Sequence, residues 1–364
     1  MSVQSKISKH LLNRSVFSYL LYPFSILFSA FLLLRRFLYS NVMPVYKAPI
    51  FVISVGNVTI GGSGKTPFTI YLAGLLHSNS VKVAVSHRGY KSSLEGSIHL
   101  ISTSDGLQPI ADEAGDEAWL IAQRLKGIPV VTGKNRKKAI KLLCATYPDL
   151  ECIILDDSFQ HLKVRHNLDF VIVNEQIGFG NGFVLPAGYL REPASAIANA
   201  DVIIRNGDIK KNCLSIKQIN YLKKINKISF RGSYTADSMY DFWEKEVEFS
   251  SLKNTKAMLL SAIGNPKGFE KSISDLNIQI LSHRILPDHF NYNDSDIVSE
   301  IVKDFLLSGA KWLITTEKDY AKLRYYKDIS EHLLVLSISF KLDKQDDILL
   351  QYIMQKMKEY YSSR

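Results

Sequence analysis

A glycine-rich segment between an apolar run and a helix-like stretch carries the clearest chemistry in this sequence. It extends from Thr59 to Thr66. Glycines let backbone N–H groups turn toward an anion, a lysine adds positive charge, and a threonine hydroxyl can bind magnesium. The segment therefore predicts a site for nucleotide phosphates. The residues expected to form it are Thr59, Gly61, Gly62, Ser63, Gly64, Lys65 and Thr66.

One position departs from the general pattern for such loops, G-x-x-x-x-G-K-[ST], because Thr59 stands where the first glycine is expected. A chance glycine-rich turn is the alternative interpretation. The order of neighbouring elements favours nucleotide binding, since a strand-like run precedes the segment and a helix-like run follows it. Pro67 falls in the first turn of that helix, where its missing N–H does no harm.

Two adjacent carboxylates, Asp156 and Asp157, end the apolar run 152–155. Nucleotide-binding sheets supply an acidic residue from a neighbouring strand to the magnesium shell. Two carboxylates in a row repel each other unless a cation is near, so a metal role is favoured over a solvated turn. We expect Asp156 and Asp157, with Thr66, to hold magnesium.

A second acidic pair, Asp116 and Glu117, opens the helix-like stretch 118–125. The pair could simply satisfy N–H groups at a helix terminus. It could instead accept a proton, because a carboxylate or a carboxylate–histidine pair commonly does so for an acceptor hydroxyl. His289, in a Pro-Asp-His string, is the candidate partner, although by itself it is as readily a structural histidine.

The elements that position these residues alternate between short apolar runs and helical periods after Pro49. This alternation predicts an α/β fold, a P-loop NTPase-like doubly wound sheet that is mostly parallel. A polar, basic stretch at 206–227 indicates a junction with a smaller second α/β domain, or one long surface connection. The predicted regions are a membrane-associated helix in 1–45, a kinase-like core in 46–225 and a C-terminal domain in 226–364.

The N-terminal run 17–34 carries no charge and has basic residues on both sides. About 18 apolar residues are near the lower limit for a bilayer-spanning helix. A cleaved signal peptide and a buried soluble helix are weaker alternatives, because no small-residue cleavage site follows and soluble helices are usually more interrupted. We expect membrane attachment, with spanning and interfacial arrangements both open.

Composition narrows the class of partner. The net charge of +10 and the pI near 9.2 favour an anionic partner, which could be nucleic acid, phospholipid or a phosphorylated small molecule. The basic run 135–138 and the stretch 210–227 match no groove-binding motif, so we interpret them as solvated faces and expect no nucleic acid. Three cysteines without metal-ligand spacing indicate a reducing compartment.

Taken together, the glycine-rich segment, the two acidic pairs and the Pro-Asp-His string resemble the tetraacyldisaccharide 4'-kinases of lipid A synthesis. The resemblance covers roughly 50–325, and the family's loop, Thr-x-Gly-Gly-Thr-Gly-Lys-Thr, accounts for Thr59. Departures are Ser63, Ala118, Ser158 and Tyr189, none of which removes a charged or nucleophilic group. The matching strings are 55–59, 61–67, 88–90, 115–117, 155–161, 180–182, 185–188, 190–193, 287–289 and 316–319.

The resemblance implies transfer of the ATP γ-phosphate to the 4'-hydroxyl of a tetraacylated glucosamine disaccharide 1-phosphate. It implies ATP and Mg2+ as cofactors, and a place at the cytoplasmic face of the inner membrane. Anionic inner-membrane lipids are expected partners, and no obligate protein partner is predicted. Basic residues around the apolar run fit anionic headgroups.

Site residues follow from the matching motifs. Asp116 with His289 would accept the hydroxyl proton, and Lys65 would contact the transferring phosphate. Arg191 is expected at the reacting phosphates, and Glu192 beside the metal. Contacts to the lipid sugar are expected from Arg88, Tyr90, Glu117 and His161.

Two rival functions remain at this stage. One is a membrane-associated P-loop ATPase or GTPase that acts as a switch or motor. The guanine-reading string Asn-Lys-x-Asp is absent, and its nearest counterpart is 316–319, so GTP is disfavoured. The other is a membrane-bound nucleic-acid protein, which salt-dependent DNA retention would support.

Overall fold

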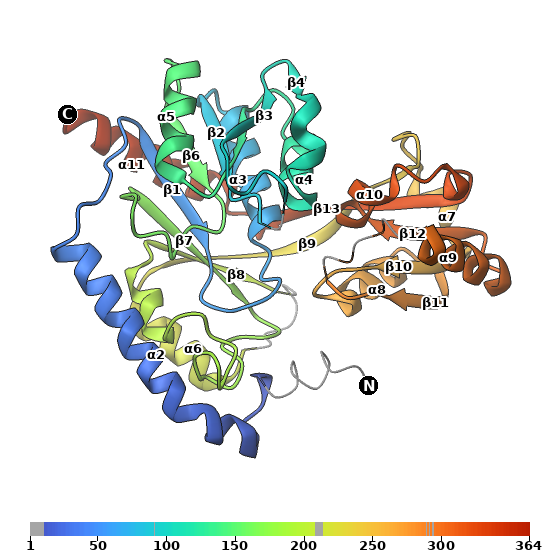
Figure 1. Ribbon diagram of the computed structural model, residues 1–364, viewed down its shortest axis with the longest axis horizontal. Coiled ribbons are helices and arrows are strands. Elements are labelled where there is room, and N and C mark those ends of the chain that lie inside the picture. Colours follow the sequence, from blue (N-terminus) through green and yellow to red (C-terminus); the bar gives the residue numbers. More distant parts are fainter. Residues whose placement is uncertain (1–10, 91, 208–213, 289, 291, 293–294) are drawn as a thin grey trace. The chain divides into compact units, whose positions relative to one another are not determined.

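The chain forms two compact units in the computed structural model (Figure 1). The residues described are 11–364 apart from 91, 208–213, 289, 291 and 293–294. Unit 1 comprises Met1–Gly115, Ile121–Ser233 and Lys341–Arg364, and unit 2 comprises Asp116–Leu120 and Tyr234–Phe340. His289, predicted to be catalytic, lies outside the described residues.

Unit 1 is built on a mostly parallel sheet. Its strand order is β9-β8-β7-β1-β6-β2-β5-β3-β4, and every neighbouring pair from β9 to β5 is parallel. Only the edge pairs β5–β3 and β3–β4 are antiparallel. The strands are β1 Phe51–Gly56, β2 Val83–His87, β3 His99–Thr103, β4 Gly106–Leu107, β5 Val130–Thr132, β6 Cys152–Leu155, β7 Leu168–Asn174, β8 Val202–Asn206 and β9 Ile228–Asp241.

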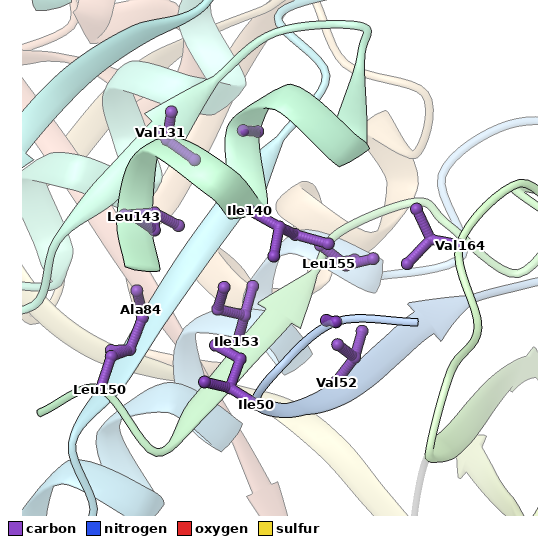
Figure 2. Packing of buried hydrophobic residues seen from close by; sticks show 12 residues of the cluster. Ile50, Val52, Ala84, Val131, Ile140, Leu143, Leu150, Ile153, Leu155 and Val164 are labelled. Atoms are coloured by element: carbon purple, nitrogen blue, oxygen red, sulfur yellow. The ribbon is translucent and has the colours of Figure 1, made fainter. Parts of the chain in front are cut away.

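The central strands are apolar along their whole length because they are buried on both faces. Every residue of β1, β2 and β6 is buried. Figure 2 shows one core cluster, in which Ile140 and Leu143 of α5 pack with Val52 and Ile153 of these strands. The helices of unit 1 are α2 Val16–Asn41, α3 Lys65–Ser78, α4 Asp116–Arg124, α5 Arg136–Thr146, α6 Ile216–Ile225 and α11 Asp346–Ser362, with 3-10 turns Pro109–Glu113 and Ala194–Asn199; the first turn of α4 belongs to unit 2.

Unit 2 repeats the parallel pattern on a smaller scale. Its order is β11-β10-β12-β13, again with parallel neighbours. Leu259, Ile314 and Leu334 of the sheet pack with Phe269 and Ile273 of α8. The elements are α7 Phe249–Leu252, β10 Lys256–Ser261, α8 Pro266–Asp275, β11 Gln279–Ile285, α9 Ser295–Ser308, β12 Trp312–Thr316, α10 Glu317–Leu323, a 3-10 turn Lys327–Ile329 and β13 Leu333–Leu342. The predicted α/β class is confirmed.

The last helix belongs with unit 1, although the sequence placed 341–364 in the C-terminal domain. The Tyr360 hydroxyl donates to the backbone carbonyls of Ala48 and Ile50, each at 3.1 Å, and Tyr71 bonds the Asp346 carboxylate. The stretch expected to join the domains contains α6, which packs on the unit 1 core. The chain passes into unit 2 later, within β9.

Helix α2 differs from a usual surface helix because its polar face is buried and its apolar face is exposed. It has 26 residues, and its most apolar window of 18 residues has a mean hydropathy of 1.9, so by length and composition it could cross a membrane. Its buried residues are Ser18 and Ser25. Only 11% of the apolar window is buried, which separates α2 from the core helix of a soluble protein. The buried face is therefore polar and the exposed face apolar.

Candidate active site

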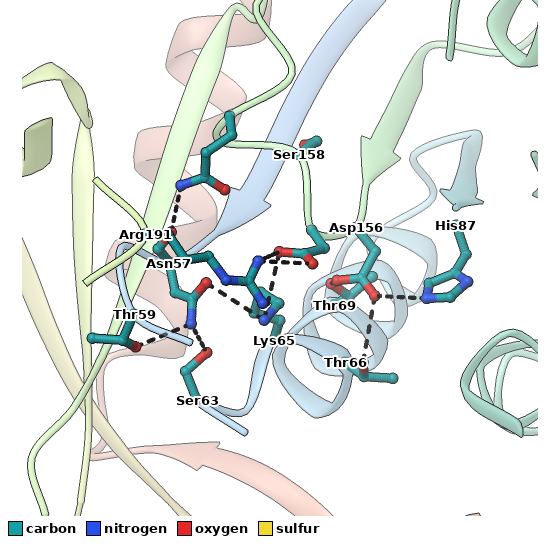
Figure 3. A network of polar contacts seen from close by, with 12 residues as sticks. Asn57, Thr59, Ser63, Lys65, Thr66, Thr69, His87, Asp156, Ser158 and Arg191 are labelled. Carbon is teal, nitrogen blue, oxygen red and sulfur yellow. Dashed lines mark hydrogen bonds and ion pairs between the residues drawn. The ribbon is translucent and has the colours of Figure 1, made fainter. Parts of the chain in front are cut away.

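The glycine-rich loop, residues 59–66, joins β1 to α3 at the carboxyl edge of the unit 1 sheet (Figure 3). Gly61 and Gly64 have φ values of 81° and 89°, in the left-handed region. A Cβ on Gly61 would meet the Tyr189 hydroxyl at 2.3 Å. Glycine is therefore favoured at Gly61 by conformation, and a larger residue would also have to displace the Tyr189 hydroxyl. Helix α3 begins at Lys65, so its N-terminal N–H groups face the concave side of a loop suited to an anion.

The side chain of Asn57 stabilises the conformation of this loop through hydrogen bonds. Its side chain is fully buried, and its amide donates to Ser63 Oγ at 2.7 Å and to Thr59 Oγ1 at 3.2 Å. Lys65 Nζ donates back to Asn57 Oδ1 at 3.5 Å. The sequence motif contained Asn57, but nothing in its pattern predicted a role. Thr59 thus contributes a hydroxyl contact where a general loop has glycine.

Asp156 stands at the end of β6, beside the start of α3. It is 1% exposed, and its carboxylate accepts hydrogen bonds from Thr69 Oγ1 at 2.9 Å and Thr66 Oγ1 at 3.4 Å. The His87 Nε2 atom lies 3.7 Å from the same carboxylate. His87 Nδ1 accepts from the Gly89 N–H at 3.0 Å, which places the ring proton on Nε2 and directs it to Asp156.

A buried arginine, Arg136, hydrogen-bonds to the backbone of Asp156. Arg136 is 2% exposed and donates to Ser86 Oγ at 3.0 Å and to the Asp156 backbone carbonyl. Burial lowers its pKa to about 10, and the charges of Asp156 and Asp157 act in the opposite direction. The sequence interpretation of 135–138 as a solvated basic face is therefore wrong for Arg136. The signal that could have found it is its place at the start of a helix that follows a buried strand.

Asp157 faces two cations instead. Both of its carboxylate oxygens accept from Arg191 Nη1 at 3.1 Å, and Lys65 Nζ lies 3.5 Å from Oδ1. The Arg191 backbone N–H donates to the Val58 carbonyl at 2.7 Å, which fixes the arginine beside the loop. Predicted residues from three separate motifs thus meet in one network. Its net charge is positive, as a phosphate site requires.

Glu192, predicted to lie beside the metal, forms a different contact. Its side chain is 2% exposed and pairs with Arg36 of α2 at 2.6 Å. Arg36 also stacks over the Phe159 ring. Among the described residues, no group of three or more His, Cys, Asp or Glu side chains gathers as a metal site. The metal role of Glu192 stays a prediction.

The residues predicted to contact a lipid sugar lie in unit 1, except Glu117. Arg88 bonds Glu95 at 2.9 Å and stacks over the half-exposed Tyr90 ring, with 5.5 Å to the centroid. Burial, followed by the charge of Arg136, lowers the pKa of His161 to about 4. His161 is therefore uncharged at neutral pH.

Asp116 and Glu117, at the start of α4, belong to unit 2. Asp116 pairs with Lys322 at 3.2 Å, and its side chain is 9% exposed. Glu117 lies 3.4 Å from Lys318, which also bonds Asp288 at 3.1 Å. Neither lysine was assigned a role from the sequence. Lys318 and Lys322 are four positions apart in α10, which places both side chains on one face of the helix.

Comparison with known proteins agrees with this geometry. Residues 17–358 match the family model described as tetraacyldisaccharide-1-P 4'-kinase, LpxK. A protein of Pelobacter propionicus named tetraacyldisaccharide 4'-kinase is 33% identical over 329 residues, 88% of this chain and 87% of that protein. One of the same name from Actinobacillus succinogenes is 34% identical over 311 residues, 85% of this chain and 87% of the relative. A crystal structure of LpxK from Aquifex aeolicus in complex with ATP has a TM-score of 0.75 at 29% identity, covering 94% of this chain and all of that one.

Proposed function

The chain belongs to the tetraacyldisaccharide-1-P 4'-kinase family, and we propose that it transfers the γ-phosphate of ATP to the 4'-hydroxyl of a tetraacylated glucosamine disaccharide 1-phosphate. The observation that carries this is the network of the glycine-rich loop. In it Thr66 meets Asp156 while Lys65 and Arg191 meet Asp157. This arrangement is the P-loop of a doubly wound nucleotide-binding fold, in which phosphates lie against the loop N–H groups.

Magnesium fits the oxygen donors at this site. Thr66 Oγ1 and Asp156 Oδ2 lie 3.4 Å apart, so hydroxyl and carboxylate oxygens already converge. Mg2+ prefers such ligands and retains part of its water shell. When bound with ATP, the ion would neutralise charge that develops on the phosphates. Asp157 is the second predicted ligand, and Thr69 and His87 keep the Asp156 carboxylate oriented.

Lys65 and Arg191 are the groups that stabilise the phosphates. Together they carry two positive charges against the one negative charge of Asp157. Phosphoryl transfer depends mainly on position and charge, because negative charge spreads over the phosphate oxygens in the transition state. As ATP enters, both cations can exchange the Asp157 carboxylate for phosphate oxygens. Lys65 acts on the transferring phosphate and Arg191 beside it.

Asp116, together with His289, accepts the proton of the sugar hydroxyl. As the hydroxyl oxygen bonds to the γ-phosphorus and the bond to ADP breaks, the proton leaves for the carboxylate. The ion pair of Asp116 with Lys322 favours the ionised carboxylate that this role needs. Contacts to the sugar and its 1-phosphate come from Arg88, Tyr90, Glu117 and His161; the lowered pKa of His161 makes its imidazole a neutral contact.

The helix α2 attaches the enzyme to the membrane surface without crossing it. The helix is held to the rest of unit 1 by Arg14, just before its start, which donates to the Asn181 carbonyl at 3.1 Å, and by Arg36 in its second half, which pairs with Glu192. In the middle, Ser25 donates to the Val184 carbonyl at 2.7 Å. The opposite face exposes an apolar stripe at helical spacing that meets lipid sideways. The stripe consists of Phe17, Leu20, Phe24, Leu27, Phe31 and Leu34, each at least 56% exposed.

The cytoplasmic face of the inner membrane is the proposed location, with anionic lipids as partners. The net charge of +10 favours an anionic surface, and Cys144 and Cys152 are both free thiols. We expect Leu20→Asp with Leu27→Asp to lower the protein's co-sedimentation with anionic vesicles at least tenfold. Leu306→Asp with Leu307→Asp is the matched control, because these leucines are 68% and 77% exposed in unit 2. Equal losses in both pairs would contradict the role of α2.

The kinase activity is tested by following label from γ-labelled ATP into lipid. Detergent-solubilised protein is incubated with Mg2+ and the tetraacyl disaccharide 1-phosphate. We expect label with the native chain and with Lys82→Ala, a 65% exposed lysine of the same unit, and none above background with Lys65→Ala. ATP hydrolysis without labelled lipid would reject the kinase assignment and favour a membrane-associated ATPase.

A further inference from the structure

The segment Thr316–Asp319 matched a family motif in the sequence but received no role. In the structure it forms the start of α10, with Thr316 as the N-cap. Thr316 Oγ1 accepts from the Asp319 N–H at 3.2 Å and donates to the Asp319 carboxylate at 2.7 Å. This reciprocal contact fixes the first turn of the helix.

Three further hydrogen bonds anchor that turn within unit 2. Asp319 is 3% exposed, and its carboxylate accepts from the Ala262 N–H at 3.1 Å and from the Tyr292 hydroxyl at 3.1 Å. Glu317, also buried, accepts from the Ile338 N–H at 3.4 Å. The turn is therefore tied to the residue that follows β10, to β13 and to the chain that follows β11. A helix held in this way can present its other side chains at fixed positions.

Lys318 and Lys322 are the side chains that it presents. Lys318 bonds Asp288 at 3.1 Å and lies 3.4 Å from Glu117. Lys322 pairs with Asp116 at 3.2 Å and donates to the Phe290 carbonyl at 3.0 Å. Each lysine thus joins one carboxylate of α4 to one residue of the loop after β11.

The charges at this point agree with the geometry. Burial acts to lower the pKa of Lys318, yet the pKa is raised because Glu117, Asp288 and Asp116 favour the ammonium form. The two lysines thus place positive charge beside Glu117 and Asp116, at 3.4 Å and 3.2 Å. Among the described residues, the charged groups near Asp116 include Lys318 and Lys322 of α10 and Glu117 of its own helix, and Asp288 is joined to the group through Lys318. The two lysines offset the negative charge of these acids.

We propose that Lys318 and Lys322 are positioning residues for phosphoryl transfer, which hold Asp116 and Glu117 against the chain at Asp288 and Phe290 and keep Asp116 ionised. This inference rests on the proposed function. In the reaction itself the proton of the acceptor hydroxyl goes to Asp116. The motif 316–319 then fixes the helix whose lysines contact the acidic pair of α4, which lies about 200 residues earlier in the sequence.

The test compares Lys318→Met with Lys318→Arg and with Lys271→Met. Lys271 forms an exposed pair with Asp275 at 3.0 Å in the same unit and is the matched control. We expect Lys318→Met to lower kcat about tenfold or more and to leave the KM for ATP within about twofold. The acid limb of the kcat–pH profile should move to higher pH by roughly one unit, because Asp116 loses a nearby cation. Lys318→Arg should restore the limb.

The outcomes separate this inference from the kinase assignment. No lipid label from the native chain would reject the assignment, whereas normal native activity with an unmoved acid limb in Lys318→Met would reject the positioning role alone. If Lys318→Met is unfolded by circular dichroism, Lys322→Gln decides. Lys322 pairs directly with Asp116, so the acid limb of the kcat–pH profile of this variant must also move to higher pH. A profile identical to that of Lys271→Met would overturn the proposal.

Discussion

In unit 1, Asp156 is held by threonine hydroxyls with a buried guanidinium behind it, whereas in unit 2 Asp116 is held by a lysine that remains 29% exposed. Arg136 is 2% exposed and donates to a backbone carbonyl. Lys322 and Lys318 reach their partners from a helix surface. Both arrangements orient a carboxylate that we propose acts in phosphoryl transfer. They differ in how much of the surrounding fold depends on them.

The difference follows from solvation. A buried charge that loses its partners retains the full cost of desolvation, while a partly exposed charge regains water. The support of Asp156 should therefore affect folding and catalysis together. The support of Asp116 should affect catalysis with little effect on folding. Substitutions in the two regions can separate these outcomes.

The largest effect is expected from Arg136→Met. This change leaves the Asp156 carbonyl and Ser86 Oγ without their buried donor, and should lower the free energy of unfolding by about 3–5 kcal/mol. Urea unfolding measures it. Lys138→Met, at an exposed position of the same helix, is the control and should change the value by less than about 0.5 kcal/mol. Equal values for both would mean that Arg136 is not a buried support.

A somewhat smaller effect is expected from Asp156→Asn, and it should appear in catalysis. The amide can still accept from Thr69, so the fold should be kept, but the charge proposed to bind magnesium is lost. We expect kcat to fall about 100-fold, which corresponds to ~2.7 kcal/mol, and half-saturation to need more Mg2+. Initial rates over a range of Mg2+ concentrations measure both. An unchanged Mg2+ dependence would contradict a metal role for Asp156.

Much of the fold and of the candidate site was accessible from sequence, because these parts are local patterns. The glycine-rich loop, the apolar run that ends at Asp156 and the uncharged run of α2 each depend on neighbours in the chain. The family and its activity are confirmed. The assignments of individual site residues stay predictions, and His289 lies outside the described residues.

What the sequence missed depends on contacts between distant segments. Arg136 appeared as one member of a basic surface run, yet it is buried against residues 50 and 20 positions away. Asn57 supports the loop only once Ser63 folds back on it. The C-terminal helix joins unit 1 through tyrosine contacts more than 300 residues apart. A pattern of residue types within a short stretch of sequence cannot indicate contacts between such distant residues.

The smallest expected effect is that of Lys322→Met on stability, and it sharpens the comparison most directly. Asp116 is 9% exposed, but the ion pair as a whole has access to solvent through Lys322, and salt screens it. Exposed pairs contribute about 0–1 kcal/mol. We expect a change below about 1 kcal/mol in urea, shrinking further at high salt. A loss of the size predicted for Arg136→Met would show that both carboxylates have buried supports. The two lysines would then contribute to folding as much as to the reaction, and the distinction between the two regions would not hold.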